Sequence, residues 1–194
     1  MIPVMEKKNN LKNTLVVNLF GAPGVGKSTI RAGVFSELKW NKIDCEEVTE
    51  FAKDLVWEQR HMALSDELYI FSEQNFRFNK LLGQVGVIVT DRPVLLSIPY
   101  VKVYSKIKDK QYIESFKNLV YYYHEQQNSL NIFLERVKPY NPNGRYQTEK
   151  ESNLLNKEFK NTLLNWGVEF TSLPGQKESV KIISELIYNK LNKK

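Results

Sequence analysis

The sequence contains 194 residues, of which 42% are hydrophobic and 26% charged, and its formal net charge is +6. A chain of this length and composition typically folds as one soluble globular domain, not as a fibrous or disordered protein. No apolar run approaches the roughly 20 residues that a membrane-spanning helix needs, so we expect no membrane partner. The first residues lack the apolar core of a secretory signal, and the single Cys45 cannot form an internal disulfide. Both features favour a cytoplasmic protein.

The excess of positive charge could indicate a nucleic-acid partner, because clustered lysines and arginines displace counterions from a phosphate backbone. Much of the excess lies near the two ends, at Lys7, Lys8, Lys12, Lys190, Lys193 and Lys194. Residues 1–13 are polar and without periodicity, so we expect a flexible leader followed by a single domain over residues 14–194. Nucleic acid remains an alternative partner, and the sequence leaves open whether the protein is a monomer or a homodimer.

The strongest signal is the segment Leu15–Ile30, in which a short apolar strand runs into a glycine-rich loop and then into a helical pattern. The segment fills every required position of the P-loop pattern GxxxxGK(S/T). Its glycines allow backbone N–H groups to surround phosphate oxygens at a helix N-terminus, where the helix dipole favours an anion. Lys27 supplies a charge for the β- and γ-phosphates, and Ser28 supplies a hydroxyl for Mg2+. We therefore predict an ATP site formed by Gly21, Ala22, Pro23, Gly24, Val25, Gly26, Lys27, Ser28 and Thr29.

Two acids follow the second expected strand. That strand is predicted over Ile43–Val48, and the next segment, Thr49–Glu58, reads as a helix with Thr49 as its N-cap. Ligands of parallel sheets bind outside the carboxyl ends of the strands. Glu50 and Asp54, one helical turn apart, are therefore candidates to face the crevice together, bind an acceptor and act as its base. Which of the two is the base stays open, and both could instead only complement the helix dipole.

Another helix is expected over Ser65–Leu82, because apolar residues recur there at helical spacing: Leu68, Phe71, Phe78 and Leu82. Most of these belong to the core. Gln74 and Arg77 are candidates to line an acceptor pocket, where they would hydrogen-bond a planar ring.

The segment Gly86–Pro93 contains an unbroken apolar run followed by an acid and a base. A continuous apolar run is typical of a central parallel strand that is covered on both faces. Asp91 would then emerge beside the P-loop, where a carboxylate can hold the hydration shell of Mg2+. Arg92 would point toward phosphate charge or the acceptor.

A basic loop follows the fourth strand, Leu130–Leu134. The loop, Glu135–Gln147, contains two prolines, a glycine and three basic residues, and the capping-box pair Thr148 and Glu151 then starts a helix. On this scaffold the pattern indicates a lid over about residues 136–150. Arg136 and Arg145 are candidates to close over the phosphates and exclude water, although they could instead be surface charge.

The remaining elements complete an α/β pattern. An amphipathic helix carries Tyr112, Phe116, Leu119 and Tyr123, a fifth strand is expected over Val168–Thr171, and a closing helix carries Val180, Ile183, Ile187 and Leu191. The loop Leu173–Lys177 could border an adenine site. Strands that alternate with helices predict a P-loop NTPase fold, with about five mostly parallel strands and helices on both faces.

The order of P-loop, acidic helix, Asp-Arg pair and basic lid resembles the nucleoside and nucleoside-monophosphate kinase group. Over about residues 14–173 it is more similar to the ribosylnicotinamide kinase domain of NadR and the phage-type P-loop ATPases grouped with it. The similarity lies in Glu50–Val56, the helix with Gln74, Val89–Asp91 and Trp166–Phe170. It implies ATP bound by residues 21–29, Glu50 or Asp54 addressing the acceptor sugar, and Arg136 and Arg145 in the lid.

The sequence thus predicts an ATP- and Mg2+-dependent kinase that phosphorylates a hydroxyl of a small nucleoside- or nucleotide-like acceptor. Lys27, Mg2+, Arg92 and the lid would stabilise charge on the transferring group. One alternative is a kinase that acts on a hydroxyl within DNA or RNA, including a modified base. A second alternative is an ATP-binding or ATPase module that regulates a partner and has no small-molecule acceptor.

Overall fold

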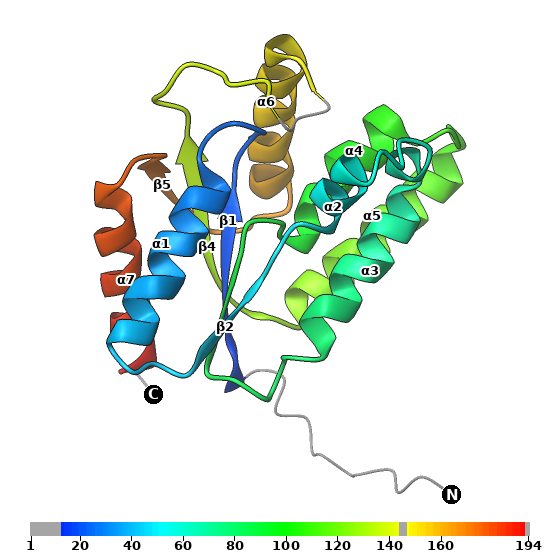
Figure 1. The fold of residues 1–194 in the computed structure, drawn as a ribbon. Coiled ribbons are helices and arrows are strands. Elements are labelled where there is room, and N and C mark those ends of the chain that lie inside the picture. The colour runs from blue at the N-terminus through cyan, green and yellow to red at the C-terminus, as the bar shows by residue number, and fades with distance from the viewer. Residues whose placement is uncertain (1–12, 144–146, 193–194) are drawn as a thin grey trace, which may run out of the picture.

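A five-stranded parallel sheet forms the centre of the protein (Figure 1). The computed structural model describes residues 13–143 and 147–192, so nearly all of the expected leader lies outside the described residues. The strand order is β2-β3-β1-β4-β5, and every neighbouring pair is parallel. The strands are β1 (Leu15–Phe20), β2 (Cys45–Val48), β3 (Val87–Thr90), β4 (Asn128–Glu135) and β5 (Thr171–Pro174). The predicted α/β fold is confirmed.

Helices cover both faces of the sheet (Figure 1). One face packs its apolar residues against α1 (Lys27–Trp40) and α7 (Glu178–Leu191). The other face carries a larger apolar cluster, to which α3 (Glu67–Asn79), α4 (Ser97–Tyr104), α5 (Lys110–Glu125) and α6 (Glu149–Asn165) contribute. Three shorter elements complete this side: α2 (Phe51–Trp57) and the 3-10 turns η2 (Ala63–Ser65) and η3 (Val94–Leu96). None of the helices within the described ranges has the length and apolar character to cross a bilayer.

The sheet register brings the segments after β1, β3 and β4 to one edge. Asn18 of β1 is level with Thr90 of β3 and with Asn131 of β4. Because all three strands run in the same direction, the P-loop, Asp91 and the segment after Glu135 all leave the sheet at its carboxyl edge. This is the edge at which open α/β sheets bind their ligands. The capping box of Thr148 and Glu151 is confirmed, and it starts α6 above the same edge.

The fifth strand begins later than the sequence predicts. The expected strand was Val168–Thr171, but β5 covers Thr171–Pro174. The physical reason is the end of α6, where Gly167 has a left-handed φ of 62° and the Val168 amide donates to the Leu163 carbonyl at 2.9 Å. Because the Val168 amide is used in this helix-ending hydrogen bond, it is not available to pair with a neighbouring strand. Leu173 and Pro174, expected in a loop beside adenine, are consequently strand residues.

The interior contains polar side chains at the centre of the sheet. Asn18 of β1 and Asn131 of β4 are both buried, and the Asn18 Nδ2 atom lies 3.1 Å from the Asn131 Oδ1 atom. Nearby on α5, His124 is only 7% exposed, and burial lowers its pKa to about 4. A charged imidazole cannot be solvated there, so His124 stays neutral in the folded protein.

His124 should make the protein sensitive to acid. Its folded pKa is about 4 against an ordinary value of 6.5, so the unfolded chain binds a proton between these pH values and the folded chain does not. The stability that the neutral His124 side chain contributes is therefore fully present above pH 6.5, and this contribution is lost as the pH falls toward 4. Relative to pH 7, wild type should lose roughly 2–3 kcal/mol more than His124→Gln at pH 4.5, measured by urea unfolding. Identical pH dependence in the two proteins would contradict a buried neutral imidazole.

Candidate functional site

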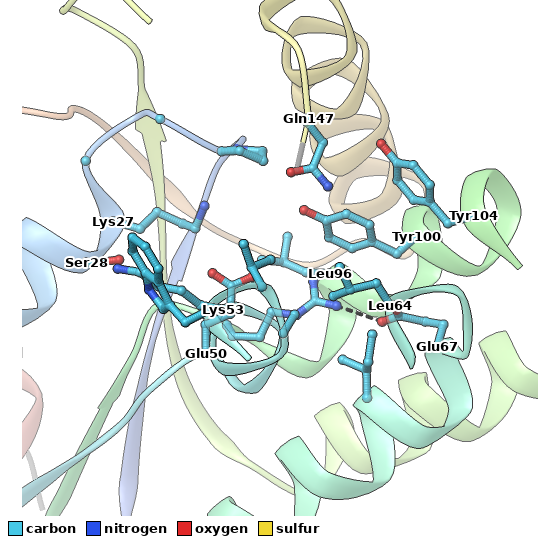
Figure 2. Close-up of a pocket in the computed structure, with 18 of the residues that line it drawn as sticks. Lys27, Ser28, Glu50, Lys53, Leu64, Glu67, Leu96, Tyr100, Tyr104 and Gln147 are labelled. Carbon is cyan, nitrogen blue, oxygen red and sulfur yellow. Dashed lines mark hydrogen bonds and ion pairs between the residues drawn. The ribbon is translucent and has the colours of Figure 1, made fainter. Parts of the chain in front are cut away.

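A cavity of about 260 Å³ lies beside the P-loop at the carboxyl edge of the sheet. Its walls come from the P-loop, α2, α3, the segment after β3, α4 and the end of the lid segment. Figure 2 shows Lys27 and Ser28 on one side of this cavity and Tyr100, Tyr104 and Gln147 on the opposite side. The P-loop and a chamber with charged and aromatic walls therefore share one space.

The P-loop has the backbone shape that a phosphate requires. Gly26 is the N-cap of α1 with a φ of 101°, and no side chain caps this helix end. The first N–H groups of a helix have no partner within the helix and carry its positive dipole end, so they are available to an anion. The Lys27 Nζ atom lies 2.8 Å from the Gly21 carbonyl oxygen and 3.1 Å from the Ala22 carbonyl oxygen. The residues present fit a bound phosphate chain.

The P-loop is held in place by two segments distant in sequence. A Cβ atom on Gly175 would lie 1.9 Å from the Val25 carbonyl oxygen, so only glycine allows the β5–α7 connection to approach this closely. On the other side, the Asn156 side chain accepts the Ala22 amide at 3.1 Å, and the Ser152 hydroxyl donates to the Pro23 carbonyl at 2.7 Å. These contacts fix the loop from α6 and from the sheet edge.

A buried ion pair forms the floor of the chamber. The Arg92 Nη2 atom lies 2.7 Å from the Glu67 Oε1 atom, and both side chains are at most 3% exposed. The Arg92 guanidinium also lies over the Tyr100 ring, 4.3 Å from its centroid. The Arg92 Nη1 atom is buried without a protein partner among the described residues, although Arg92 lines the cavity. Glu67 and Tyr100 together hold the guanidinium rigidly at the base of the chamber.

Burial also sets the protonation of this floor. It raises the pKa of Glu67 to about 7, and the Arg92 guanidinium opposes that rise. Burial raises the pKa of Tyr100 far above its ordinary value, so its phenol stays protonated and remains a hydrogen-bond donor. The chamber therefore presents a fixed guanidinium and a neutral phenol near the phosphate loop.

The structure separates the two acids that follow β2. Glu50 lines the cavity as expected, but Asp54 does not, because its carboxylate pairs with Arg77 at 2.7 Å. Gln74 does not line the cavity either: its Oε1 atom accepts the Phe51 amide at 3.0 Å, and its Nε2 atom donates to the Thr49 carbonyl at 3.1 Å. The expected pocket-lining positions of Asp54, Gln74 and Arg77 are thus corrected, since their side chains hold α2 against α3.

The N-cap of α2 is a second correction in this region. The cap residue is Glu50, without a side-chain cap bond, and Thr49 instead accepts from Arg77 at 3.2 Å. The Glu50 side chain consequently makes no hydrogen bond to the backbone of α2.

Asp91 lies directly after β3, as predicted, but it does not line the cavity. It is 2% exposed, and its Oδ1 atom lies 3.4 Å from Arg31 Nη1, while Arg31 Nε lies 3.4 Å from Glu47. Within the described ranges, no three acidic, histidine or cysteine side chains group as metal ligands. Of the two residues that the sequence predicts as metal ligands, Ser28 lines the cavity and Asp91 does not.

The lid arginine that can be described does not line the cavity. Arg136 Nη2 donates to the Pro23 carbonyl at 3.1 Å and to the Ser152 hydroxyl at 2.5 Å, and its guanidinium lies over Tyr140. Arg136 therefore links the lid segment to the P-loop and α6, which corrects its expected position over the phosphates. Arg145 lies outside the described residues. From the lid segment, Asn143 and Gln147 reach the cavity.

Sequence reasoning missed several cavity residues: Lys53, Trp57, Glu67, Leu96, Tyr100 and Tyr104. For the two tyrosines a signal existed, since they are four residues apart on one helix and so share a face. Glu67 carried no such signal. It directly follows the N-cap Asp66, where an acid is common for dipole reasons alone.

Comparisons with known proteins agree with this geometry. A protein-family model described as an AAA domain matches residues 16–181. The chain belongs to the AAA domain family. A sequence comparison with curated proteins finds no match.

Two similar solved structures confirm the P-loop NTPase fold and, at the level of the fold, the likeness to NadR. A NadR protein in complex with NR has a TM-score of 0.69 and 15% identity, covering 91% of this chain and 52% of that one. A NadR protein in complex with NAD and AMP-PNP has a TM-score of 0.66 and 14% identity, covering 89% of this chain and 49% of that one. The chain spans about half the length of these NadR chains.

The Glu67–Arg92 pair should show strong energetic coupling. Arg92→Met leaves a buried carboxylate without its partner, so it should reduce the free energy of unfolding by about 3–5 kcal/mol at pH 8, measured in urea. The double variant Glu67→Gln/Arg92→Met should recover a large part of this loss, because no buried charge then remains. Additive effects of the two single substitutions would show that the ion pair is not formed.

Proposed function

We propose that the protein is an ATP- and Mg2+-dependent phosphotransferase that phosphorylates a hydroxyl of a small nucleoside-like acceptor. The observation that carries this proposal is the shared cavity, in which the P-loop opens into a chamber lined by Glu50, Arg92 and aromatic side chains. A module that only binds or hydrolyses a nucleotide has no need of such a chamber. The fold shared with NadR, solved in complex with NR and with AMP-PNP, supports the same reaction class.

The nucleotide would occupy residues 21–29. Phosphate oxygens would take the place of the loop carbonyls that now contact Lys27, so that the ammonium group neutralises charge on the transferring phosphoryl group. Mg2+ would be held by the Ser28 hydroxyl and phosphate oxygens, and when bound it neutralises the charge on those oxygens. Asp91 stays a proposed contributor to the metal's hydration shell, with Arg31 as its present partner.

Glu50 is the residue we assign as the base. Glu50 lines the cavity and its side chain makes no cap bond to α2, whereas Asp54 is paired with Arg77. A carboxylate beside the acceptor hydroxyl can accept its proton as the phosphoryl group arrives. The Arg92 guanidinium, held by Glu67 and Tyr100, would place a fixed positive charge at the base of the acceptor chamber. Asn143 and Gln147 would close the chamber from the lid segment.

The chamber favours a compact acceptor over a polymer. Apart from Lys27 of the P-loop, its ionic side chains are two acids, Glu50 and Glu67, and two bases, Lys53 and Arg92, which balance one another. A balanced chamber with aromatic walls suits an uncharged ring with hydroxyl groups better than a polyanion.

The activity can be tested with γ-labelled ATP, Mg2+ and a panel of nucleosides, nucleotides and oligonucleotides. Label on a nucleoside supports the proposal, label on an oligonucleotide supports the nucleic-acid alternative, and free phosphate alone supports an ATPase. Lys27→Ala should lower transfer at least about a hundredfold, because a preorganised charge at the reacting group is lost. Lys39→Ala, at the far end of α1, serves as the matched control and should transfer at the wild-type rate. Wild-type transfer by Lys27→Ala would contradict the phosphate-site assignment.

The two acids of α2 provide a second test with an internal control. Glu50→Gln should lower kcat by roughly a hundredfold or more, because an amide cannot accept the acceptor proton. Asp54→Asn should change kcat less than about threefold, since Asp54 contacts Arg77 and not the cavity. Both variants are measured at saturating ATP and acceptor. If Asp54→Asn is the slower enzyme, the assignment of the base is wrong.

A further inference from the structure

A second cleft lies at the amino end of the strands, opposite to the P-loop. It has a volume of about 740 Å³ and is bounded by the end of α5, the start of β4 and the segment between α6 and β5. Lys190 of α7 closes one side. None of the residues assigned to phosphate transfer lines this cleft.

The cleft exists because β5 starts late. β5 pairs with β4 only from Ile132, which is level with Thr171, so Asn128–Asn131 of β4 have no β5 partner. The Asn131 side chain donates to the Glu169 carbonyl at 3.0 Å and holds the incoming segment away from the ladder. The Lys190 amine donates to the Ser129 carbonyl. This hydrogen bond replaces one that a paired β5 strand would otherwise make to β4. The first half of β4 therefore forms the floor of an open cleft.

One side chain that lines the cleft contains a polar atom that no described residue satisfies. It is the His124 Nδ1 atom, which is buried and makes no hydrogen bond among the described residues. A second such atom lies behind the floor: the Asn131 oxygen faces the Asn18 Nδ2 atom at 3.1 Å, and the Asn18 Oδ1 atom is left buried without a partner in the described part of the chain, although Asn18 does not itself line the cleft. Such groups are uncommon in folded proteins, and each costs about 1–3 kcal/mol.

The charge and aromatic content of the cleft indicate the ligand. Two exposed carboxylates, Glu125 and Glu169, line it, and among the described residues Lys190 is the one cation that does, already in contact with Ser129. Tyr121 and Trp166 stand together in its wall with ring centroids 4.0 Å apart. Because burial lowers the pKa of His124 to about 4, the imidazole adds no positive charge at neutral pH. Carboxylates and aromatic faces together attract organic cations.

We propose that this cleft binds a small organic cation, a primary amine or guanidinium on a short apolar chain, independently of phosphate transfer. The cationic group would lie between the two glutamates, its chain would pack on Trp166, and its N–H groups would approach the His124 Nδ1 atom. The same chemistry is carried by free amines and by arginine or lysine side chains.

The test uses isothermal titration calorimetry with agmatine, which has a guanidinium and an amine joined by a butyl chain. Agmatine should bind with one-to-one stoichiometry and more weakly at higher salt, and the net-neutral 4-guanidinobutanoate should bind at least about tenfold more weakly. Gly-Arg-Gly with blocked ends is the second probe. Tighter binding of this peptide than of agmatine identifies a protein side chain as the source, and the reverse identifies a free amine.

Variants locate the binding and separate it from fold damage. Glu125→Gln/Glu169→Gln should weaken agmatine binding by about tenfold, while Glu185→Gln, an exposed acid of α7 that does not line the cleft, should not change it. Lys190→Met should strengthen binding by about threefold, because a competing positive charge is removed, and a damaged fold could not produce that gain. Thermal unfolding of each variant is recorded in parallel.

Three results would overturn the proposal. They are no heat of binding at millimolar agmatine, equal affinity in the double glutamate variant, and preferential binding of uncharged adenosine in this cleft.

Discussion

The P-loop keeps its shape because the backbone at Gly175, in the β5–α7 connection, packs directly against Val25 of the loop. The contact is between backbones, and a single added methyl group at Gly175 would collide with the Val25 carbonyl. Ser152 and Asn156 of α6 hold the loop from the other side. A phosphate loop without such support would have to become ordered when its ligand arrives, which costs binding free energy. The rest of the site is built outward from this fixed loop.

The sequence predicted the P-loop side of the cavity much better than the opposite side, where we propose that an acceptor binds. The P-loop is one contiguous segment whose geometry follows from its own glycines and from the helix after it, so local reasoning was sufficient. The chamber instead depends on contacts between segments far apart, such as Arg92 with Glu67 and Asp54 with Arg77. A sequence identifies these charges but not their partners. Glu50 and Asp54 were therefore equivalent in the sequence and are distinct in the structure.

The error in β5 has a comparable origin. The residues before Thr171 read as an alternating strand, and their β propensity is real, but the end of α6 already uses the Val168 amide. Asn131 then uses the Glu169 carbonyl. A strand cannot form where its backbone groups are bonded elsewhere. β propensity describes the preference of a segment in isolation. Here the end of α6 and Asn131 of β4 determine where β5 begins.

The position of Lys27 has a consequence for the energetics of nucleotide exchange. Its ammonium group contacts the Gly21 and Ala22 carbonyl oxygens, so the loop provides an internal substitute for a phosphate. An incoming nucleotide then replaces one set of charge-assisted hydrogen bonds with another in a loop that is already ordered. Because the loop is already ordered, the ordering cost of binding would be small for this part of the site, and the affinity would reflect how much better phosphate oxygens pair with the ammonium than amide oxygens do. In the proposed reaction, the same two carbonyls would compete with the product for Lys27 and so favour its release.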